Sequence, residues 1–161
     1  VDARHYQPVG ARLVLATRAQ AGVIDPAHGH PSDVPFSKKY FLGGASSIRG
    51  WGRYEVSPLG GSGLPVGGNS MLAFSAEARM RLGGSLGMVA FADAGTVWAG
   101  EFDASTGGMR YAVGPGLRYQ TPVGPIRVDA GFQVNPIPGL LVDGAPQARR
   151  WRLHFSIGQA F

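Results

Sequence analysis

The stretch LAFSAEARMRL, residues 72–82, alternates between apolar and polar side chains. Its even positions are all apolar, and from position 75 its odd positions are polar or charged, namely Ser75, Glu77, Arg79 and Arg81. A period of two is typical of a β-strand whose two faces meet different surroundings. Residues 72–82 therefore predict a strand with one apolar face and one charged face.

The same alternation recurs along the chain, and no segment has a convincing helical period. The expected strands cover about residues 11–24, 68–82, 86–98, 110–121, 125–135 and 149–161. The predicted fold is therefore all-β, with about six antiparallel strands. The beginning of the chain is ambiguous, because Asp2, Arg4 and His5 fit either the end of a preceding strand or a loop.

The strands of a soluble sandwich would also alternate between apolar and polar residues. The lengths of the strands and connections therefore have to distinguish a soluble sandwich from a membrane barrel. Each expected strand has about the ~9–11 residues that a tilted strand needs to cross a bilayer, whereas soluble strands commonly have ~5–6. The connections are alternately long and short: 25–67, 83–85, 99–109, 122–124 and 136–148. This plan is typical of an outer-membrane barrel, and so are aromatic residues near strand ends: Trp98, Tyr111, Tyr119, Trp151 and Phe161.

Composition agrees with a barrel more than with a nucleic-acid-binding protein. The formal net charge is +5, but the arginines are spread over alternating positions, which indicates the lining of a wet lumen. The chain has no cysteine, so it has no disulfide and no thiolate metal site. The chain contains no run of ~18 apolar residues, so the sequence does not predict a transmembrane helix. The first ten residues lack the plan of a secretion signal, so we expect a removed signal or a longer parent chain.

Six strands are too few to close a barrel. Membrane barrels begin at ~8 strands, and each unpaired backbone group at an open edge in lipid costs several kcal/mol. We therefore expect a C-terminal portion of a larger barrel whose other strands lie upstream. Self-association is the less favoured alternative.

The connection at residues 25–67 is the candidate functional element. Loops longer than ~12–15 residues are usually functional or disordered, and FSKKYFLGGASSIRGW at 36–51 is too apolar for a solvated linker. Its candidate site residues are Gly43, Gly44, Ile48, Arg49, Gly50 and Trp51.

If this loop folds back into the lumen, the Arg49 guanidinium needs carboxylate partners. The charged faces of the next two strands offer Glu77 and Asp93, and bidentate pairing would pin the loop inside the barrel. The alternative is that Glu77 pairs with Arg79 or Arg81 and that Asp93 merely lies in a polar lumen. Spacing alone leaves both interpretations open.

Several segments resemble one family in the correct order. SIRGW (47–51), preceded by FLGG, is similar to the V-R-G-F/Y motif in the sixth extracellular loop of the BamA/TamA-type outer-membrane assembly superfamily, the bacterial surface antigen family, which is related to FhaC-type two-partner secretion transporters. GGNSMLAFSAEARM (67–80) resembles the strand after that loop, and TPVGPIRVDAGF (121–132) resembles the hairpin of that family. FADAG resembles its F-x-D-x-G motif, with Phe91, Asp93 and Gly95. HFSIGQAF resembles its final strand and assembly signal, with Phe155, Ile157 and Phe161.

The resemblance implies the last six strands of a sixteen-stranded barrel in the bacterial outer membrane. It also implies that Arg49 contacts Glu77 and Asp93, and that the locked loop is needed for biogenesis and activity. The implied partners are the lipid bilayer, the upstream strands, unfolded outer-membrane or secreted clients, and periplasmic factors recruited by N-terminal domains. Ile48 and Trp51 depart mildly from the motif, and Pro115 within a strand predicts a bulge.

Three other functions remain as alternatives: a passive porin, a two-partner secretion channel, and the membrane anchor of an N-terminal passenger. We expect no enzyme, cofactor or nucleic-acid partner, because the chain has no G-x-S-x-G and no phosphate loop. His28 and His30, with Asp25 and Asp33, offer metal ligands, but histidines in such an external loop are more often solvated.

Overall fold

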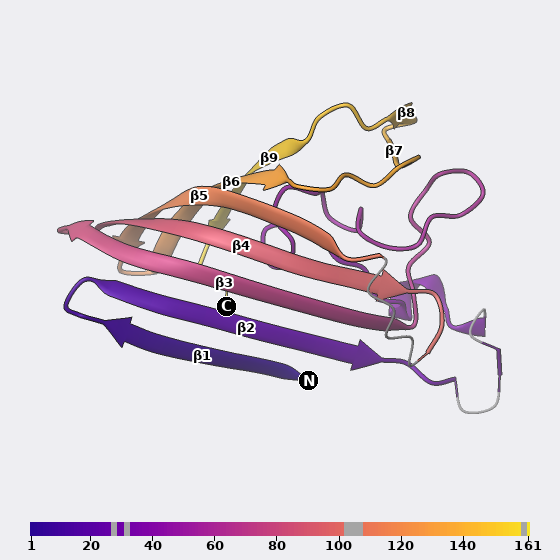
Figure 1. Cartoon of the computed structure of the whole chain (residues 1–161), viewed down its shortest axis with the longest axis horizontal. Helices are drawn as coiled ribbons and strands as arrows, with labels where there is room; N and C mark the ends of the chain where they lie inside the picture. Colours follow the sequence, from indigo (N-terminus) through magenta and orange to yellow (C-terminus); the bar gives the residue numbers. More distant parts are fainter. Residues whose placement is uncertain (27–28, 31–32, 102–107, 159–160) are drawn as a thin grey trace.

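The computed structural model describes residues 1–26, 29–30, 33–101, 108–158 and 161. Within these residues, seven strands form one antiparallel sheet in the order β1-β2-β3-β4-β5-β6-β9. The strands are β1 (Asp2–Val9), β2 (Leu13–Val23), β3 (Ser70–Gly83), β4 (Leu86–Trp98), β5 (Arg110–Thr121), β6 (Gly124–Gln133) and β9 (Trp151–Ile157). The sheet is curved and open, with β1 and β9 at its free edges (Figure 1). The prediction of an antiparallel all-β fold that does not close by itself is confirmed.

The sheet has one strand more than the about six expected, because the ambiguous beginning of the chain forms β1. Residues 2–9 pair with β2 along their whole length, from Asp2 opposite Gln20 to Val9 opposite Leu13. This strand lacks a clean alternation, because polar side chains stand at both odd and even positions of DARHYQPV. β1 is therefore defined by its backbone pairing with β2, because its side-chain pattern does not predict a strand.

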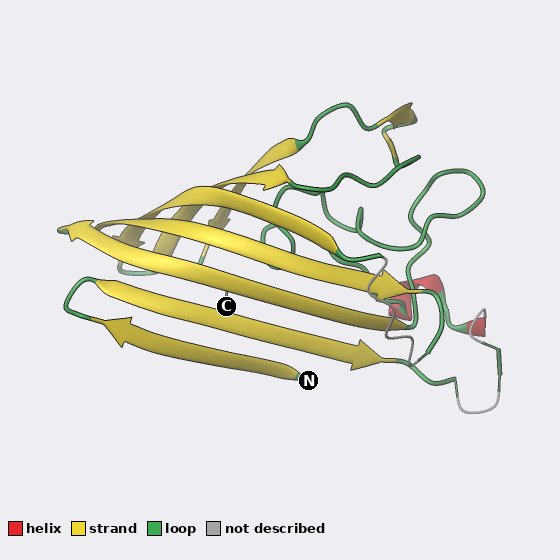
Figure 2. Ribbon diagram, in the orientation of Figure 1, coloured by secondary structure: helices red, strands yellow, loops and turns green. Residues whose placement is uncertain are grey.

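All short turns lie at one end of the sheet and the long connections lie at the other (Figure 2). The connection from β2 to β3 contains the 3-10 turn η2 (Phe36–Lys38), and the connection from β6 to β9 contains a hairpin of β7 (Leu141–Val142) and β8 (Ala145–Pro146). Among the described residues, no α-helix has the length and apolar content required for a membrane span.

Pro115 does not cause the expected bulge. The register between β5 and β6 is the same on both sides of it, with Val113 opposite Phe132 and Gly116 opposite Asp129. On its other side β5 stays in register with β4, where Ala90 lies opposite Pro115. The missing proline donor is therefore tolerated within a continuous strand.

The two faces of the sheet differ in the way that the alternation predicts. Large apolar side chains of the outward face are exposed, among them Leu15, Phe74, Leu117, Phe132 and Leu153. An apolar surface of this extent is a liability in water and suits contact with lipid.

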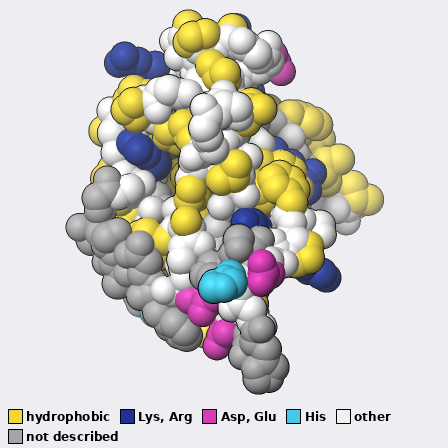
Figure 3. Space-filling view, turned by 90° about the vertical axis from the view of Figure 1, so that its right-hand side faces the viewer, with side chains coloured by type: hydrophobic (Ala, Val, Ile, Leu, Met, Phe, Trp, Pro, Cys, Tyr) yellow, Lys and Arg dark blue, Asp and Glu magenta, His cyan; other side chains and the backbone are white. Residues whose placement is uncertain are grey.

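The apolar core lies on the inward face, at the end that carries the long connections. Loop residues pack there against residues of the sheet, and the buried cluster comprises Leu42, Ile48, Trp51, Val56, Ala73, Val97, Ala112 and Leu140. Figure 3, which looks onto this end, shows hydrophobic side chains gathered across its middle. The long loop therefore fills the concavity of the sheet.

Candidate functional site

The tip of the loop is a tight hairpin. Leu42 pairs with Val56, and the Gly44 N–H donates to the Trp51 carbonyl at 3.1 Å. Gly43 and Gly44 have φ angles of 107° and 94°. These angles favour glycine, because a Cβ would clash with the backbone in this conformation. The hairpin places residues 48–51 at its tip.

The tip residues are buried against the sheet. Ile48 and Trp51 have no exposed surface, and Arg49 is 1% exposed. Gly50, at φ 106°, lies against the backbone of Gly131. A Cβ on Gly131 would collide with the Gly50 nitrogen, so this wall position must also be small.

Arg49 makes a bidentate ion pair with Asp93 of β4. Its Nε and Nη2 atoms donate to the two carboxylate oxygens at 2.8 and 2.7 Å, and its backbone N–H donates to Asp93 at 3.0 Å. Its Nη1 atom donates to Glu77 Oε1 of β3 at 2.5 Å. The structure thus brings together the loop arginine and both carboxylates singled out from the sequence.

The two other residues of the FADAG segment also contact the loop. The Arg49 guanidinium lies over the Phe91 ring, 3.6 Å from its centroid. Gly95 leaves room for the side chains of Ile48 and Leu42, both of which a Cβ there would meet within 3 Å. Alternate residues of one strand therefore supply a ring, a carboxylate and an open space to the same loop tip.

The alternative pairing of Glu77 is present as well. Arg79 Nε donates to Glu77 Oε2 at 2.6 Å, while Arg49 holds the other oxygen. Each oxygen of Glu77 has its own guanidinium, so the pairing with Arg79 coexists with the pairing to Arg49, whereas Asp93 does not merely lie in a polar lumen. Arg81 instead donates to the Ala11 carbonyl at 2.8 Å.

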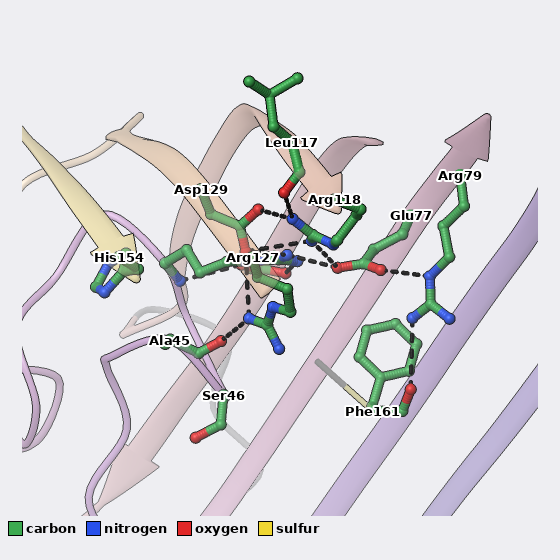
Figure 4. Close-up of polar contacts among 12 residues, drawn as sticks. Ala45, Ser46, Glu77, Arg79, Leu117, Arg118, Arg127, Asp129, His154 and Phe161 are labelled. Atoms are coloured by element: carbon green, nitrogen blue, oxygen red, sulfur yellow. Dashed lines mark hydrogen bonds and ion pairs between the residues drawn. The ribbon is translucent and has the colours of Figure 1, made fainter. Parts of the chain in front are cut away.

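A third carboxylate, which the sequence motifs did not single out, belongs to the site. Asp129 of β6 lies 3.5 Å from Arg49 and pairs with Arg118 at 2.5 Å and Arg127 at 3.2 Å (Figure 4). Arg127 also donates to the Ala45 carbonyl at 2.9 Å, and so fixes the loop backbone. The available signal was the alternation of strand 125–135, which put Asp129 on the charged face with Arg127.

The electrostatics keep Arg49 ionised. Burial by itself would lower the pKa of its guanidinium, but hydrogen bonding to Asp93 and the charges of Asp93 and Glu77 raise that pKa above its ordinary value. A buried guanidinium is tolerated only where such partners replace its water. The site can therefore hold a loop in place through charge-assisted hydrogen bonds.

The candidate C-terminal residues divide between the two faces. Phe155 and Ile157 point outward and are 68% and 64% exposed. Phe161 was expected on that same outward face, in an interfacial girdle, and this expectation was wrong. It is buried against Ala16, and its ring lies 4.9 Å from the Arg79 guanidinium (Figure 4).

The different position of Phe161 follows from the end of β9. The strand ends at Ile157, four residues earlier than expected, and Gly158 has a φ of 101°. Because the strand ends before Gly158, which has a left-handed conformation, the alternation of β9 no longer assigns a face to Phe161.

The candidate metal ligands do not form a site in the described residues. The backbone N–H of His30 donates to Asp33 at 2.8 Å, and His28 lies outside the described residues. Among the residues described, no three His, Cys, Asp or Glu side chains gather as ligands.

A curved antiparallel sheet with an apolar outward face, a charged inward face and a loop held on the inner side defines part of an outer-membrane β-barrel wall. Comparison with known proteins agrees. Residues 1–161 match the Omp85 superfamily domain, and the chain belongs to this superfamily.

Two curated relatives are outer membrane protein assembly factors BamA. The chain is 29% identical over 167 residues to the protein of Nitratidesulfovibrio vulgaris, covering 100% of this chain and 20% of the relative. It is 24% identical over 192 residues to that of Neisseria meningitidis serogroup B, covering 97% of this chain and 23% of the relative. The chain therefore spans about a fifth of the length of these relatives.

A solved structure has the same fold. The crystal structure of BamA from Haemophilus ducreyi lacking POTRA domains 1–3 superposes with a TM-score of 0.71 at 21% sequence identity. The match covers 86% of this chain and 31% of that chain.

Proposed function

We propose that this chain is the C-terminal barrel portion of a protein that assembles or inserts other proteins in the outer membrane, with its long loop locked in the lumen through Arg49. Membership of the Omp85 superfamily and similarity to BamA proteins over the whole chain support this function. The proposed clients are unfolded outer-membrane proteins. Periplasmic factors would be recruited by domains upstream of these residues.

The observation that carries the proposal is the buried contact of Arg49 with carboxylates of two neighbouring strands. One guanidinium thereby ties the loop to β3 and β4, while Gln133 of β6 donates to the Gly50 carbonyl at 2.8 Å. A loop tied to several strands braces one side of the barrel. The seam between the first and last strands is then the part left to open, and its free edge would template an incoming strand by β-augmentation.

The loop also bears on the rival functions. A passive porin needs an open channel, whereas this loop packs a buried apolar cluster against the inner face of the sheet. Conductance in planar bilayers separates the two, since a porin gives a large and steady current. A secretion channel and a passenger anchor differ from an assembly factor in their cargo, which client-insertion assays with the full-length protein measure.

Replacement of Arg49 by alanine in the full-length protein tests the lock. We expect the loop to become protease-sensitive and the amount of folded, heat-modifiable barrel in membranes to fall several-fold. Asp93 is then left buried without its main partner, and breaking a buried ion pair in this way costs about 3–5 kcal/mol.

Arg53→Ala is the matched control, because Arg53 belongs to the same loop and is exposed. It should leave protease resistance and barrel levels unchanged. Wild-type protease resistance and heat-modifiability in the Arg49→Ala protein would remove the lock from the proposed function.

A further inference from the structure

A second set of contacts joins the loop to the last strand, away from Arg49. Glu55 is 8% exposed and follows the loop tip. Its carboxylate forms an ion pair with Arg152 of β9, accepts the Gly52 N–H at 2.7 Å and accepts Gln147 Nε2 at 3.1 Å. The Glu55 carboxylate therefore joins its own loop to β9 and to the connection that precedes β9.

The next inward-facing residue of β9 contacts the loop tip directly. The Gly50 N–H donates to His154 Nε2 at 3.3 Å. Arg152 and His154 are consecutive inward positions of the strand, so the loop holds both of them. In Figure 4, His154 and Glu77 lie on opposite sides of Arg127.

The third inward position of β9 differs. The Ser156 hydroxyl is buried and has no hydrogen-bond partner among the described residues. Within the described part of the chain, Arg152 and His154 thus attach the inward face of β9 to the loop, and the Ser156 side chain adds no hydrogen bond to it.

The backbone of the loop is built for this approach. A Cβ on Gly52 would meet the Glu55 carboxylate and lie 3.0 Å from the Arg152 guanidinium carbon. A glycine at this position therefore leaves room for the Glu55 carboxylate beside the Arg152 guanidinium.

The geometry points to Glu55 as a second anchor, which clamps the Trp151 half of β9 to the loop and leaves the Ile157 half as the part of the seam that opens. The loop then acts as a hinge for the last strand. β9 separates from the first strand along the seam, beginning at Ile157 and proceeding toward Arg152. An extended client segment would enter at the end of the sheet that carries the short turns. The clamp stands on the contacts above, and its part in client entry rests on the proposed function.

Amide hydrogen exchange of the full-length protein in lipid nanodiscs tests the clamp. In the wild type, we expect residues 151–154 to exchange more slowly than residues 155–157. Glu55→Gln and Arg152→Gln should each speed exchange at 151–154 by about fivefold, the upper range for a partly exposed ion pair. The charge-swapped double variant Glu55→Arg with Arg152→Glu should restore much of the protection, and Arg53→Ala should change nothing.

Uniform exchange along β9 in the wild type, or unchanged exchange in Glu55→Gln, would overturn the clamp. Client insertion is measured in parallel in the same nanodiscs. Faster exchange with an altered insertion rate supports the whole inference, whereas faster exchange with wild-type insertion overturns the role of the hinge in client entry. An absence of insertion by the wild type would instead contradict the proposed function and leave the exchange result valid.

Discussion

Asp93 depends on Arg49 more completely than Glu77 does. Among the described residues, the hydrogen bonds that Asp93 accepts all come from the side chain and backbone of Arg49. Glu77 is also bound by Arg79 at 2.6 Å and lies 3.7 Å from Arg118. The two carboxylates carry the same charge, but they differ in the partners that they keep when Arg49 loses contact. Asp93 loses the hydrogen bonds named above, whereas Glu77 keeps Arg79.

We therefore expect Asp93→Asn to destabilise the loop more than Glu77→Gln. An amide at position 93 turns a donor toward the guanidinium, at a cost of about 3–5 kcal/mol for a broken buried pair. After Glu77→Gln, the partly exposed Arg79 side chain can reach water, and the expected loss is about 1–3 kcal/mol. Loop proteolysis rates and the temperature of the heat-modifiability transition measure the difference.

The double variant Arg49→Ala with Asp93→Asn completes a double-mutant cycle with the two single variants. Because it leaves no unpaired charge at position 93, its loss should be smaller than the sum of the two single losses. Equal effects of Asp93→Asn and Glu77→Gln, or strict additivity in this cycle, would contradict the asymmetric pairing.

At the scale of the element, the loop tip depends on its turn as much as on its charge. Gly43 has a φ of 107°, and a Cβ there would collide with the Gly52 carbonyl. Ser47 completes the turn, since its hydroxyl donates to the Gly43 carbonyl and accepts the Gly43 N–H. The turn sets the direction in which residues 48–51 reach the wall.

Gly43→Ala should consequently release the loop even though Arg49 is intact. Left-handed strain and the backbone clash together cost about 1–3 kcal/mol or more. The expected result is protease sensitivity within residues 36–56 of the full-length barrel. Gly61→Ala is the matched control in the same loop, because a Cβ on Gly61 would meet no other atom within 4 Å and the backbone there is not left-handed. Similar behaviour of the two variants would show that the turn is not required.

At the scale of the whole molecule, two free edges decide the behaviour of the chain. β1 and β9 each pair on one side only, and a sheet edge in lipid leaves backbone groups unsatisfied at several kcal/mol each. The sheet is curved but does not close (Figure 1). Strands from outside these residues must therefore complete the wall.

Residues 1–161 expressed alone should accordingly give no heat-modifiable monomer when refolded into detergent or liposomes. The same residues joined to the upstream barrel of their parent protein should give one, since the edges are then paired. Semi-native electrophoresis with and without boiling measures this. A monomeric band from the short chain that shifts on heating would contradict the need for upstream strands.

Much of this architecture was determined by the sequence itself. The period of two in residues 72–82 and its repeats specified strands with an apolar and a charged face, because side chains alternate across a strand whatever its neighbours are. The same local rule placed Glu77, Asp93 and Asp129 on the inner face. The resemblance of SIRGW, GGNSMLAFSAEARM and FADAG to family motifs then selected Arg49, Glu77 and Asp93 among many possible pairs.

Other features were decided only by the tertiary structure. The pairing of Asp129 with the loop network and of Glu55 with Arg152 joins residues roughly 80 to 100 positions apart, and no local pattern specifies such contacts. Strand β1 exists because β2 offers it a backbone ladder, and Phe161 turns inward because Gly158 ends the strand. Alternation assigns each side chain to a face, whereas the curvature of the sheet and the path of the loop backbone decide which side chains on that face meet.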